Sequence, residues 1–122
     1  MANNRVVHFE IPANDPQALT KFYGELFGWT FARSPSPMVE YWNCTTGTGD
    51  PGINGGIVKK QTATHPCMNY VDVASIDQAI EKAEKLGAKV ALPKIPVPGI
   101  GMIACLIDPE GNAFGLFEHK AG

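Results

Sequence analysis

The stretch that decides the fold runs from Arg5 to Gly28 and reads RVVHFEIPANDPQALTKFYGELFG. Its first seven residues are rich in β-branched and aromatic side chains and are followed by Pro12, which is typical of a strand. Asp15-Pro16 then supplies a capping side chain and a proline for the first turn of a helix. Apolar residues recur behind this start at spacings of three and four until Gly28, which ends the predicted helix.

The same signals return in the second half of the chain. Met68–Val73 is a second strand-like run, Ser75-Ile-Asp-Gln78 is a capping box, and Gly87 ends a second apolar helix. Tyr70 follows His8 by 62 residues, and Gly87 follows Gly28 by 59. Strand, cap and helix stop recur in the same order, which indicates an internal repeat.

Each predicted helix is followed by three strand-like runs: Trp29–Arg33, Val39–Thr45 and Ile53–Val58 in the first half, and Lys89–Leu92, Met102–Ile107 and Ala113–Phe117 in the second. The turns Asp50-Pro-Gly52 and Asp108-Pro-Glu-Gly111 precede the last run of each half. The repeat predicts an α+β fold in which residues 1–122 form one domain of two tandem βαβββ modules, about 5–58 and 67–118. We expect their strands to form a curved mixed sheet, shaped as a cup, with the helices on its outer face.

Composition excludes several classes of protein. The chain has 122 residues, and ten Lys and Arg against twelve Asp and Glu give a net charge of −2, which does not suit a nucleic-acid-binding module. No apolar run approaches the ~20 residues of a membrane span. The three cysteines form no CxxC pair, and the polar start has no signal-peptide core. We therefore expect a cytoplasmic protein without nucleic-acid or membrane partners.

The duplicated unit carries short motifs that resemble those of the vicinal oxygen chelate superfamily. They are His8-Phe-Glu-Ile-Pro12, Asp15-Pro16, Phe22-Tyr23, Leu26-Phe-Gly-Trp29, Ile53-Asn-Gly-Gly56 and Asp108-Pro-Glu-Gly-Asn112. This superfamily contains glyoxalase I, extradiol dioxygenases, fosfomycin resistance enzymes and bleomycin resistance proteins. The resemblance covers nearly the whole chain and implies a homodimer that binds a small organic molecule in its cup.

The resemblance also implies four positions that hold a divalent metal in many members of the superfamily. In this sequence they fall on His8, near Gly56, on Tyr70 and on Gly115. Only His8 is an ordinary metal ligand, and two glycines supply no side chain. We therefore predict no cofactor, with a divalent metal (Zn, Ni, Mn or Fe) as the alternative, in which an acid such as Glu118 or a partner chain completes the site.

Strand alternation puts His8 and Glu10 on one face, and Tyr70 and Asp72 on the matching face of the second half. A histidine beside a carboxylate can transfer protons, and a tyrosine can donate a hydrogen bond to a carbonyl or an anion. The candidate catalytic residues are therefore His8, Glu10 and Tyr70. The alternative is a hydrogen-bonded pocket histidine with solvent-paired carboxylates.

The candidate ligand pocket consists of Trp42, Asn54, Gly56, Asp72, Met102 and Gly115. Core packing is the alternative for Trp42 and Met102. Phe22, Phe27 and Leu86 are expected in the core, the proline-rich run 93–101 as a rim loop, and His119 in the tail.

Three functions fit these features. The first is a glyoxalase-like small-molecule-binding protein or enzyme without the usual metal. The second is a metal-dependent lyase, isomerase or dioxygenase that acts on a small oxygenated substrate. The third is a resistance-type protein that sequesters a drug or toxin, so whether the chain is an enzyme stays open.

Overall fold

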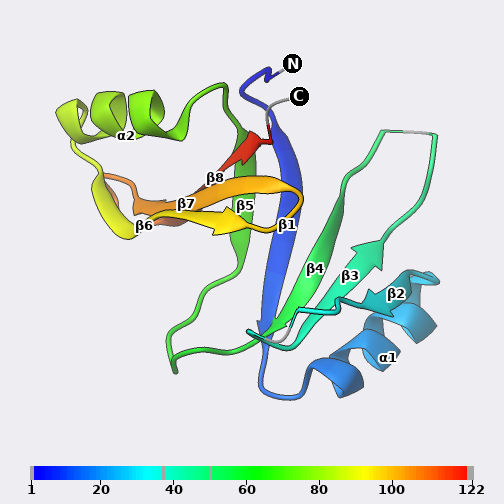
Figure 1. The fold of residues 1–122 in the computed structure, drawn as a ribbon. Helices are drawn as coiled ribbons and strands as arrows, with labels where there is room; N and C mark the ends of the chain where they lie inside the picture. Colours follow the sequence, from blue (N-terminus) through cyan, green and yellow to red (C-terminus); the bar gives the residue numbers. More distant parts are fainter. Residues whose placement is uncertain (1, 37, 50, 121–122) are drawn as a thin grey trace. The chain divides into compact units, whose positions relative to one another are not determined.

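The computed structural model describes residues 2–36, 38–49 and 51–120, which fall into two compact units. We call His8–Cys67 the N-terminal module, and residues 2–7 together with 68–120 the C-terminal module. Over the described part of the chain there are eight strands and two helices (Figure 1).

The N-terminal module contains α1 (Pro16–Phe27) and four strands, β1 (Val6–Ala13), β2 (Thr30–Arg33), β3 (Tyr41–Thr45) and β4 (Asn54–Lys59). Its strand order is β2-β3-β4-β1, in which β1 runs parallel to β4 and the other pairs are antiparallel. The first two residues of β1 belong to the C-terminal module. Just before them, the Asn4 amide donates to the Asp72 carbonyl at 2.9 Å.

The C-terminal module repeats this plan with α2 (Ile76–Lys85) and four strands, β5 (Met68–Asp72), β6 (Lys89–Val97), β7 (Gly101–Ile107) and β8 (Ala113–His119). Its order is β5-β8-β7-β6, in which β5 runs parallel to β8 and the other pairs are antiparallel. The α+β class and the two βαβββ modules are therefore confirmed.

The local signals that predicted the helices act as expected. The Asp15 carboxylate accepts from the Ala18 amide at 3.1 Å, and the Ser75 hydroxyl accepts from the Gln78 amide at 3.2 Å. Both bonds satisfy amides that the first helical turn leaves without a partner. Gly28 ends α1 in the left-handed conformation, with φ of 77°.

Each helix packs on one face of its own sheet. In the C-terminal module the buried core under α2 consists of Val73, Ile76, Ala104, Leu106 and Leu116. In the N-terminal module, Trp29 stacks on Tyr23 of α1 with ring centroids 5.3 Å apart, and contacts Phe9 of β1 at 5.9 Å. Phe9 therefore marks the face of β1 that carries α1.

Three residues expected in the core are exposed. Phe22 is 54% exposed, Phe27 58% and Leu86 70%, so the prediction of burial was wrong for all of them. On α1 the apolar periodicity marks the helix but does not bury these rings, since Pro16 is the buried residue of the described helix. Leu86 is the residue that ends α2, where the helix stops packing on the sheet.

Three further expectations concern the prolines of residues 93–101, the position of His119 and the turn at Asp108. Pro93 and Pro96 do not lie in a rim loop, because β6 continues to Val97 as an edge strand with two register shifts, a setting that tolerates proline. His119 lies in β8 rather than in a tail. The turn at Asp108 is confirmed, since its carboxylate accepts from the Asn112 amide at 2.9 Å, whereas Asp50 lies outside the described residues.

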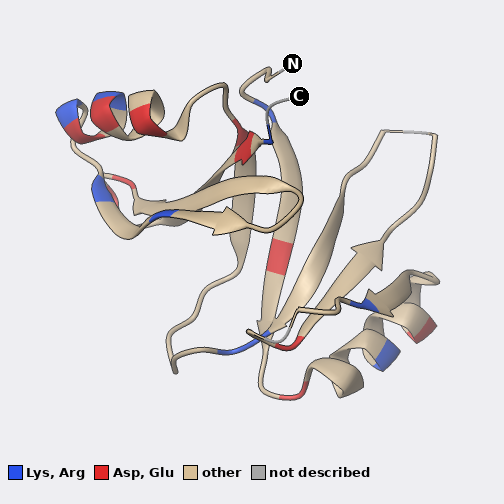
Figure 2. Ribbon diagram, in the orientation of Figure 1, with Lys and Arg blue, Asp and Glu red and all other residues tan. Residues whose placement is uncertain are grey.

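Charged residues gather on α2 (Figure 2), with Asp77 in its first turn and Lys82 and Lys85 in its last. The acidic residue lies at the positive end of the helix dipole and the basic residues lie at its negative end, which stabilises the helix. Neither helix of the described chain is long and apolar enough to cross a membrane.

Candidate functional site

The side chains of His8 and Glu10 lie on the face of the N-terminal sheet opposite α1. Successive residues of a strand point to opposite faces, and Phe9 between them points toward Trp29 and the helix. The parallel register pairs His8 with Asn54 and Glu10 with Gly56 on β4. The predicted pair of a histidine and a carboxylate on one face therefore exists.

A third polar side chain, Tyr41 of β3, completes a cluster with this pair. The Tyr41 hydroxyl lies 2.7 Å from His8 Nε2, and the two rings are nearly parallel, with an interplanar angle of 14°. The same hydroxyl is hydrogen-bonded to the Glu10 carboxylate. We call His8, Glu10 and Tyr41 the polar cluster.

Gly56 makes this cluster possible. Strand β4 lies between β3 and β1, so the Tyr41 side chain must pass over β4 to reach His8 and Glu10. It does so at Gly56, where an added Cβ would stand 2.1 Å from the Tyr41 hydroxyl oxygen. The glycine is needed here because the tyrosine ring occupies the space of a side chain.

Burial sets the protonation states of the cluster. It lowers the pKa of His8 from its ordinary value, so the imidazole is neutral at pH 7. Burial and, after it, the charge and hydrogen bond of Glu10 raise the pKa of Tyr41, so the phenol keeps its proton. Tyr41 then donates to the Glu10 carboxylate and accepts from the Nε2–H of His8, a wiring that assigns the tautomer of the ring.

The other two predicted pocket residues of the N-terminal module, Asn54 and Trp42, lie on opposite faces of the sheet. Asn54 lies on the face of His8, and its carboxamide oxygen accepts from the Thr46 amide at 2.9 Å. Trp42 pairs with Ile57, one position away from Gly56, and so lies on the opposite face, which carries α1. Its indole N–H donates to the Glu40 carboxylate at 3.0 Å, so the structure does not bring Trp42 to the polar cluster.

The C-terminal module places Tyr70 and Asp72 on the sheet face opposite α2. The Tyr70 ring covers Gly115 on the neighbouring strand, where an added Cβ would stand 2.3 Å from Cδ2. Asp72 is buried at 5% exposure, and its Oδ1 has no hydrogen-bond partner among the described residues. Met102 does not share this face, because it packs against the core under α2.

The residues at the four positions implied by the resemblance do not fit a divalent metal. The place of a side chain at Gly56 is filled by the Tyr41 ring, and the place at Gly115 by the Tyr70 ring. His8 Nε2 is engaged with Tyr41 at 2.7 Å. Among residues 2–36, 38–49 and 51–120, no three His, Cys, Asp or Glu side chains are grouped closely enough to hold an ion.

Glu118, the acid considered as an additional ligand, has another role. Its carboxylate accepts from the Ile76 amide at 2.8 Å and so caps the first turn of α2.

Sequence reasoning missed Tyr41 as a site residue. Strand parity separates Tyr41 from Trp42 but does not say which of the two faces the helix. Gly56 is the signal that could have pointed to Tyr41, because a glycine in a central strand leaves room for a large side chain of a neighbouring strand to cross above it.

Comparisons with known proteins agree with this architecture. The model of the glyoxalase-like domain matches residues 7–117. The chain belongs to the glyoxalase-like domain family. A relative, a glyoxylase-like domain-containing protein of Didymella fabae, is 27% identical over 119 residues, which cover 93% of each chain. The resemblance to the vicinal oxygen chelate superfamily is thereby confirmed.

Solved structures share the fold of this glyoxalase-like chain at low sequence identity. A hypothetical protein from Bacillus halodurans has a TM-score of 0.75 at 14% identity, with 98% of this chain and 97% of that chain covered. A variant of Streptomyces coelicolor methylmalonyl-CoA epimerase, in complex with 2-nitronate-propionyl-CoA, has a TM-score of 0.72 at 17% identity, with 97% and 99% covered. The epimerase from Mycobacterium tuberculosis has a TM-score of 0.74 at 10% identity, with 98% and 90% covered.

Proposed function

We propose that this glyoxalase-like protein binds a small oxygenated organic molecule at the polar cluster and transfers a proton on it without a divalent metal. The observation that carries this proposal is the 2.7 Å contact between His8 Nε2 and the Tyr41 hydroxyl, in a cluster that also holds Glu10. A neutral imidazole, a protonated phenol and a carboxylate on one sheet face are the groups that general acid–base chemistry requires.

The three side chains have distinct roles in this proposal. His8 is the base: burial lowers its pKa and keeps the ring neutral, and because Nε2 carries the proton donated to Tyr41, the substrate proton goes to Nδ1. Glu10 stabilises the imidazolium that forms, acting through the phenol between them. Tyr41 holds the ring of His8 in one orientation, and Gly56 positions Tyr41.

The fold neighbours support a substrate whose proton lies next to a carbonyl group. Epimerisation at such a carbon removes a proton on one side and adds a proton on the other, so it needs a base and a proton donor and no redox chemistry; the polar cluster would supply the base. We therefore favour small carbonyl-bearing acids and thioesters as the substrate class. Pocket roles for Asn54, Gly56, Asp72 and Gly115, a hydrogen-bonding role for Tyr70, and a homodimer are further parts of the proposal.

Deuterium exchange tests the chemistry directly. The protein is treated with a chelator, ligands are chosen from a panel of small carbonyl acids and thioesters by thermal shift, and each is followed by proton NMR in D₂O. The wild type should incorporate deuterium next to the carbonyl, and His8→Ala should lose about 10²-fold or more of that rate. Tyr41→Phe removes the hydroxyl group of the polar cluster. Its matched control is Tyr23→Phe, because Tyr23 lies on the α1 side of the sheet.

Two outcomes contradict the proposal. The first is exchange that continues in His8→Ala or appears only when a metal is added. The second is a ligand that raises thermal stability but is recovered without deuterium, which supports the sequestering function instead.

A further inference from the structure

The proton transfer proposed for the polar cluster leaves a negative charge on the substrate. When a base takes a proton next to a carbonyl group, the carbonyl oxygen becomes an enolate oxygen, which hydrogen-bond donors stabilise. The cluster uses its own donors internally, because the Tyr41 proton goes to Glu10 and the Nε2 proton of His8 goes to Tyr41. The chemistry therefore requires a further donor on this face of the sheet.

Asn54, the first residue of β4, places such a donor beside His8. Strands β1 and β4 are parallel neighbours (Figure 1), and their register pairs these two residues, so both side chains leave the same face of strands that lie about 5 Å apart. The Asn54 carboxamide oxygen accepts from the Thr46 amide at 2.9 Å, which identifies the other end of the group as the NH₂. Within the described chain that NH₂ group has no acceptor, and Asn54 is exposed.

The substrate has room on this side of the cluster. Asn54 lines a hollow of about 640 Å³ together with Thr46 and Thr48 of the turn between β3 and β4. A molecule whose carbonyl oxygen lies at Asn54 can therefore extend over this turn while its neighbouring carbon lies at His8.

The charges of the N-terminal module favour an uncharged carbonyl group at this place. The carboxylate on the His8 face is that of Glu10, which repels an anionic ligand. Loss of a proton next to a carboxylate would also put two negative charges on one ligand, whereas a thioester or a ketone takes only one. The basic residues of the described module lie elsewhere: Lys21 on α1, Arg33 on the edge strand β2, and Lys59 and Lys60 at or just beyond the far end of β4.

We propose that the Asn54 NH₂ group donates to the carbonyl oxygen of the substrate, and that this carbonyl belongs to a thioester or a ketone rather than to a carboxylate. This role rests on the proposed function and narrows the substrate class of the same site. In the step itself, the C–H proton passes to Nδ1 of His8, the C–H electron pair forms the enolate double bond, and the carbonyl pair moves to the oxygen at Asn54. In D₂O the imidazolium exchanges its proton and returns a deuteron to the carbon.

Three probes that share a butanoyl group test the role of Asn54. S-methyl butanethioate and methyl propyl ketone are uncharged, and butyrate is their charged counterpart. Each is titrated into the chelator-treated full-length protein, and proton–nitrogen NMR follows the side-chain amide of Asn54. The uncharged probes should shift these signals, and butyrate should bind there at least about tenfold more weakly.

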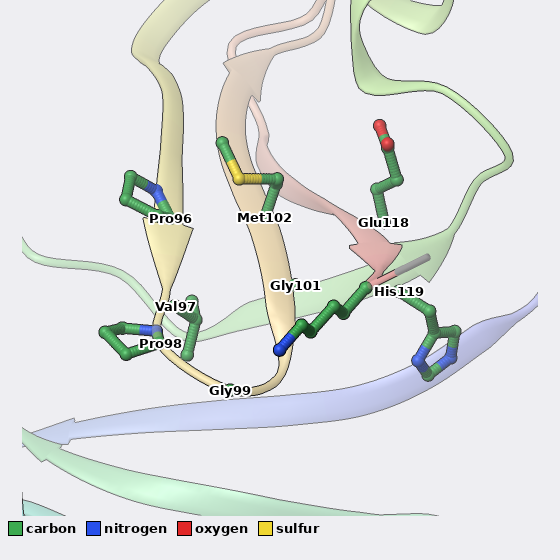
Figure 3. Close-up of a pocket in the computed structure, with 9 residues that line it drawn as sticks. Pro96, Val97, Pro98, Gly99, Gly101, Met102, Glu118 and His119 are labelled. Carbon is green, nitrogen blue, oxygen red and sulfur yellow. The ribbon is translucent and has the colours of Figure 1, made fainter. Parts of the chain in front are cut away.

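The amide signals are needed because the C-terminal module offers butyrate a lysine. Figure 3 shows a hollow of about 310 Å³ in that module, lined by residues that include Lys120, His119 and Gly99. A lysine attracts a carboxylate, so butyrate bound in that hollow would shift the His119 ring and leave Asn54 unchanged. Total binding would not separate the two places, whereas the signals of Asn54 and His119 do.

An aspartate variant separates the donor from the fold. Asn54→Asp keeps an oxygen for the Thr46 amide and replaces the NH₂ group with a charged oxygen, so deuterium incorporation into the uncharged probes should fall at least about tenfold. Asn43→Asp is the matched control, because Asn43 is exposed and pairs with Gly56 on the same face, but lies on β3 and not beside His8. It should exchange within about threefold of the wild type.

The outcomes distinguish this role from the proposed function. Shifts at Asn54 without deuterium incorporation would support the carbonyl contact and contradict the proton transfer. Exchange that is lost in His8→Ala but continues at the wild-type rate in Asn54→Asp would support the proton transfer and overturn the role of Asn54. That role is equally overturned if the uncharged probes leave the Asn54 signals unchanged, if butyrate binds there as tightly as they do, or if Asn43→Asp loses as much exchange as Asn54→Asp.

Discussion

Replacing Gly56 with alanine should break the polar cluster without removing any of its polar groups. The new Cβ would stand 2.1 Å from the Tyr41 hydroxyl oxygen and 2.2 Å from Cζ, where ordinary contacts begin at 3.4 Å. The ring must therefore retreat by about 1.3 Å, the difference between 3.4 and 2.1. A movement of that size removes the hydroxyl from His8 Nε2, which is now 2.7 Å away.

The expected cost follows from two terms. Overpacking a fitted site costs about 1–3 kcal/mol, and the lost hydrogen bond adds about 1 kcal/mol, so the free energy of unfolding should fall by about 2–4 kcal/mol. Proton transfer from the substrate to His8 should become slower as well, because His8 loses the group that orients it. Urea denaturation measures the first effect, and deuterium exchange measures the second.

Gly47→Ala is the matched control, because an added Cβ at Gly47 meets nothing within 4 Å. Its free energy of unfolding should stay within about 1 kcal/mol of the wild type. In the double variant, Tyr41→Ala should recover part of the loss caused by Gly56→Ala, since the two residues share one space. Equal stability of the Gly56→Ala and Gly47→Ala variants would refute the idea that Tyr41 fills the glycine position.

Three further predictions concern charge, packing and capping. Burial lowers the pKa of His8 below its ordinary 6.5, so the unfolded chain takes up the proton first as the pH falls. The free energy of unfolding should therefore stay constant above pH 6.5 and decline below it, and the decline should be less steep in His8→Asn. Denaturation between about pH 7.5 and 5.5 measures both. Ile76 is 0% exposed, so Ile76→Ala should lower the free energy of unfolding by about 2–5 kcal/mol. Phe22 is 54% exposed, so Phe22→Ser should lower it far less. Equal losses of the two variants in thermal denaturation would contradict the packing described. Asp15→Ala should cost about 1 kcal/mol through its lost cap, and an unchanged melting temperature would show that the cap adds nothing.

Local chemistry made much of this fold predictable. The caps at Asp15 and Ser75 and the helix stop at Gly28 depend on residues close together in the chain, and all three act as the sequence indicates. The repeat also predicted the strands. Strand β6 extends past two prolines, which it tolerates because it lies at the edge of its sheet.

The arrangement of the site could be predicted only in part. His8 and Glu10 share a face because they lie two residues apart on one strand. Tyr41 joins them through strand order and register, which place a glycine between the tyrosine and the histidine, and neither is visible in the spacing of residues. The exposure of Phe22 was missed for a related reason, since apolar periodicity marks a helix but does not set how much of it the sheet covers.

The central claim is that His8 is a neutral base held by Tyr41, and imidazole NMR tests it most directly. A long-range proton–nitrogen spectrum at about pH 7.5 reports which ring nitrogen of His8 carries the proton, and a pH titration gives its pKa. The structure predicts a ring protonated at Nε2, a pKa below 6.5, and altered ring signals in Tyr41→Phe. A pKa at or above 6.5, a proton on Nδ1, or identical His8 signals in wild type and Tyr41→Phe would contradict it.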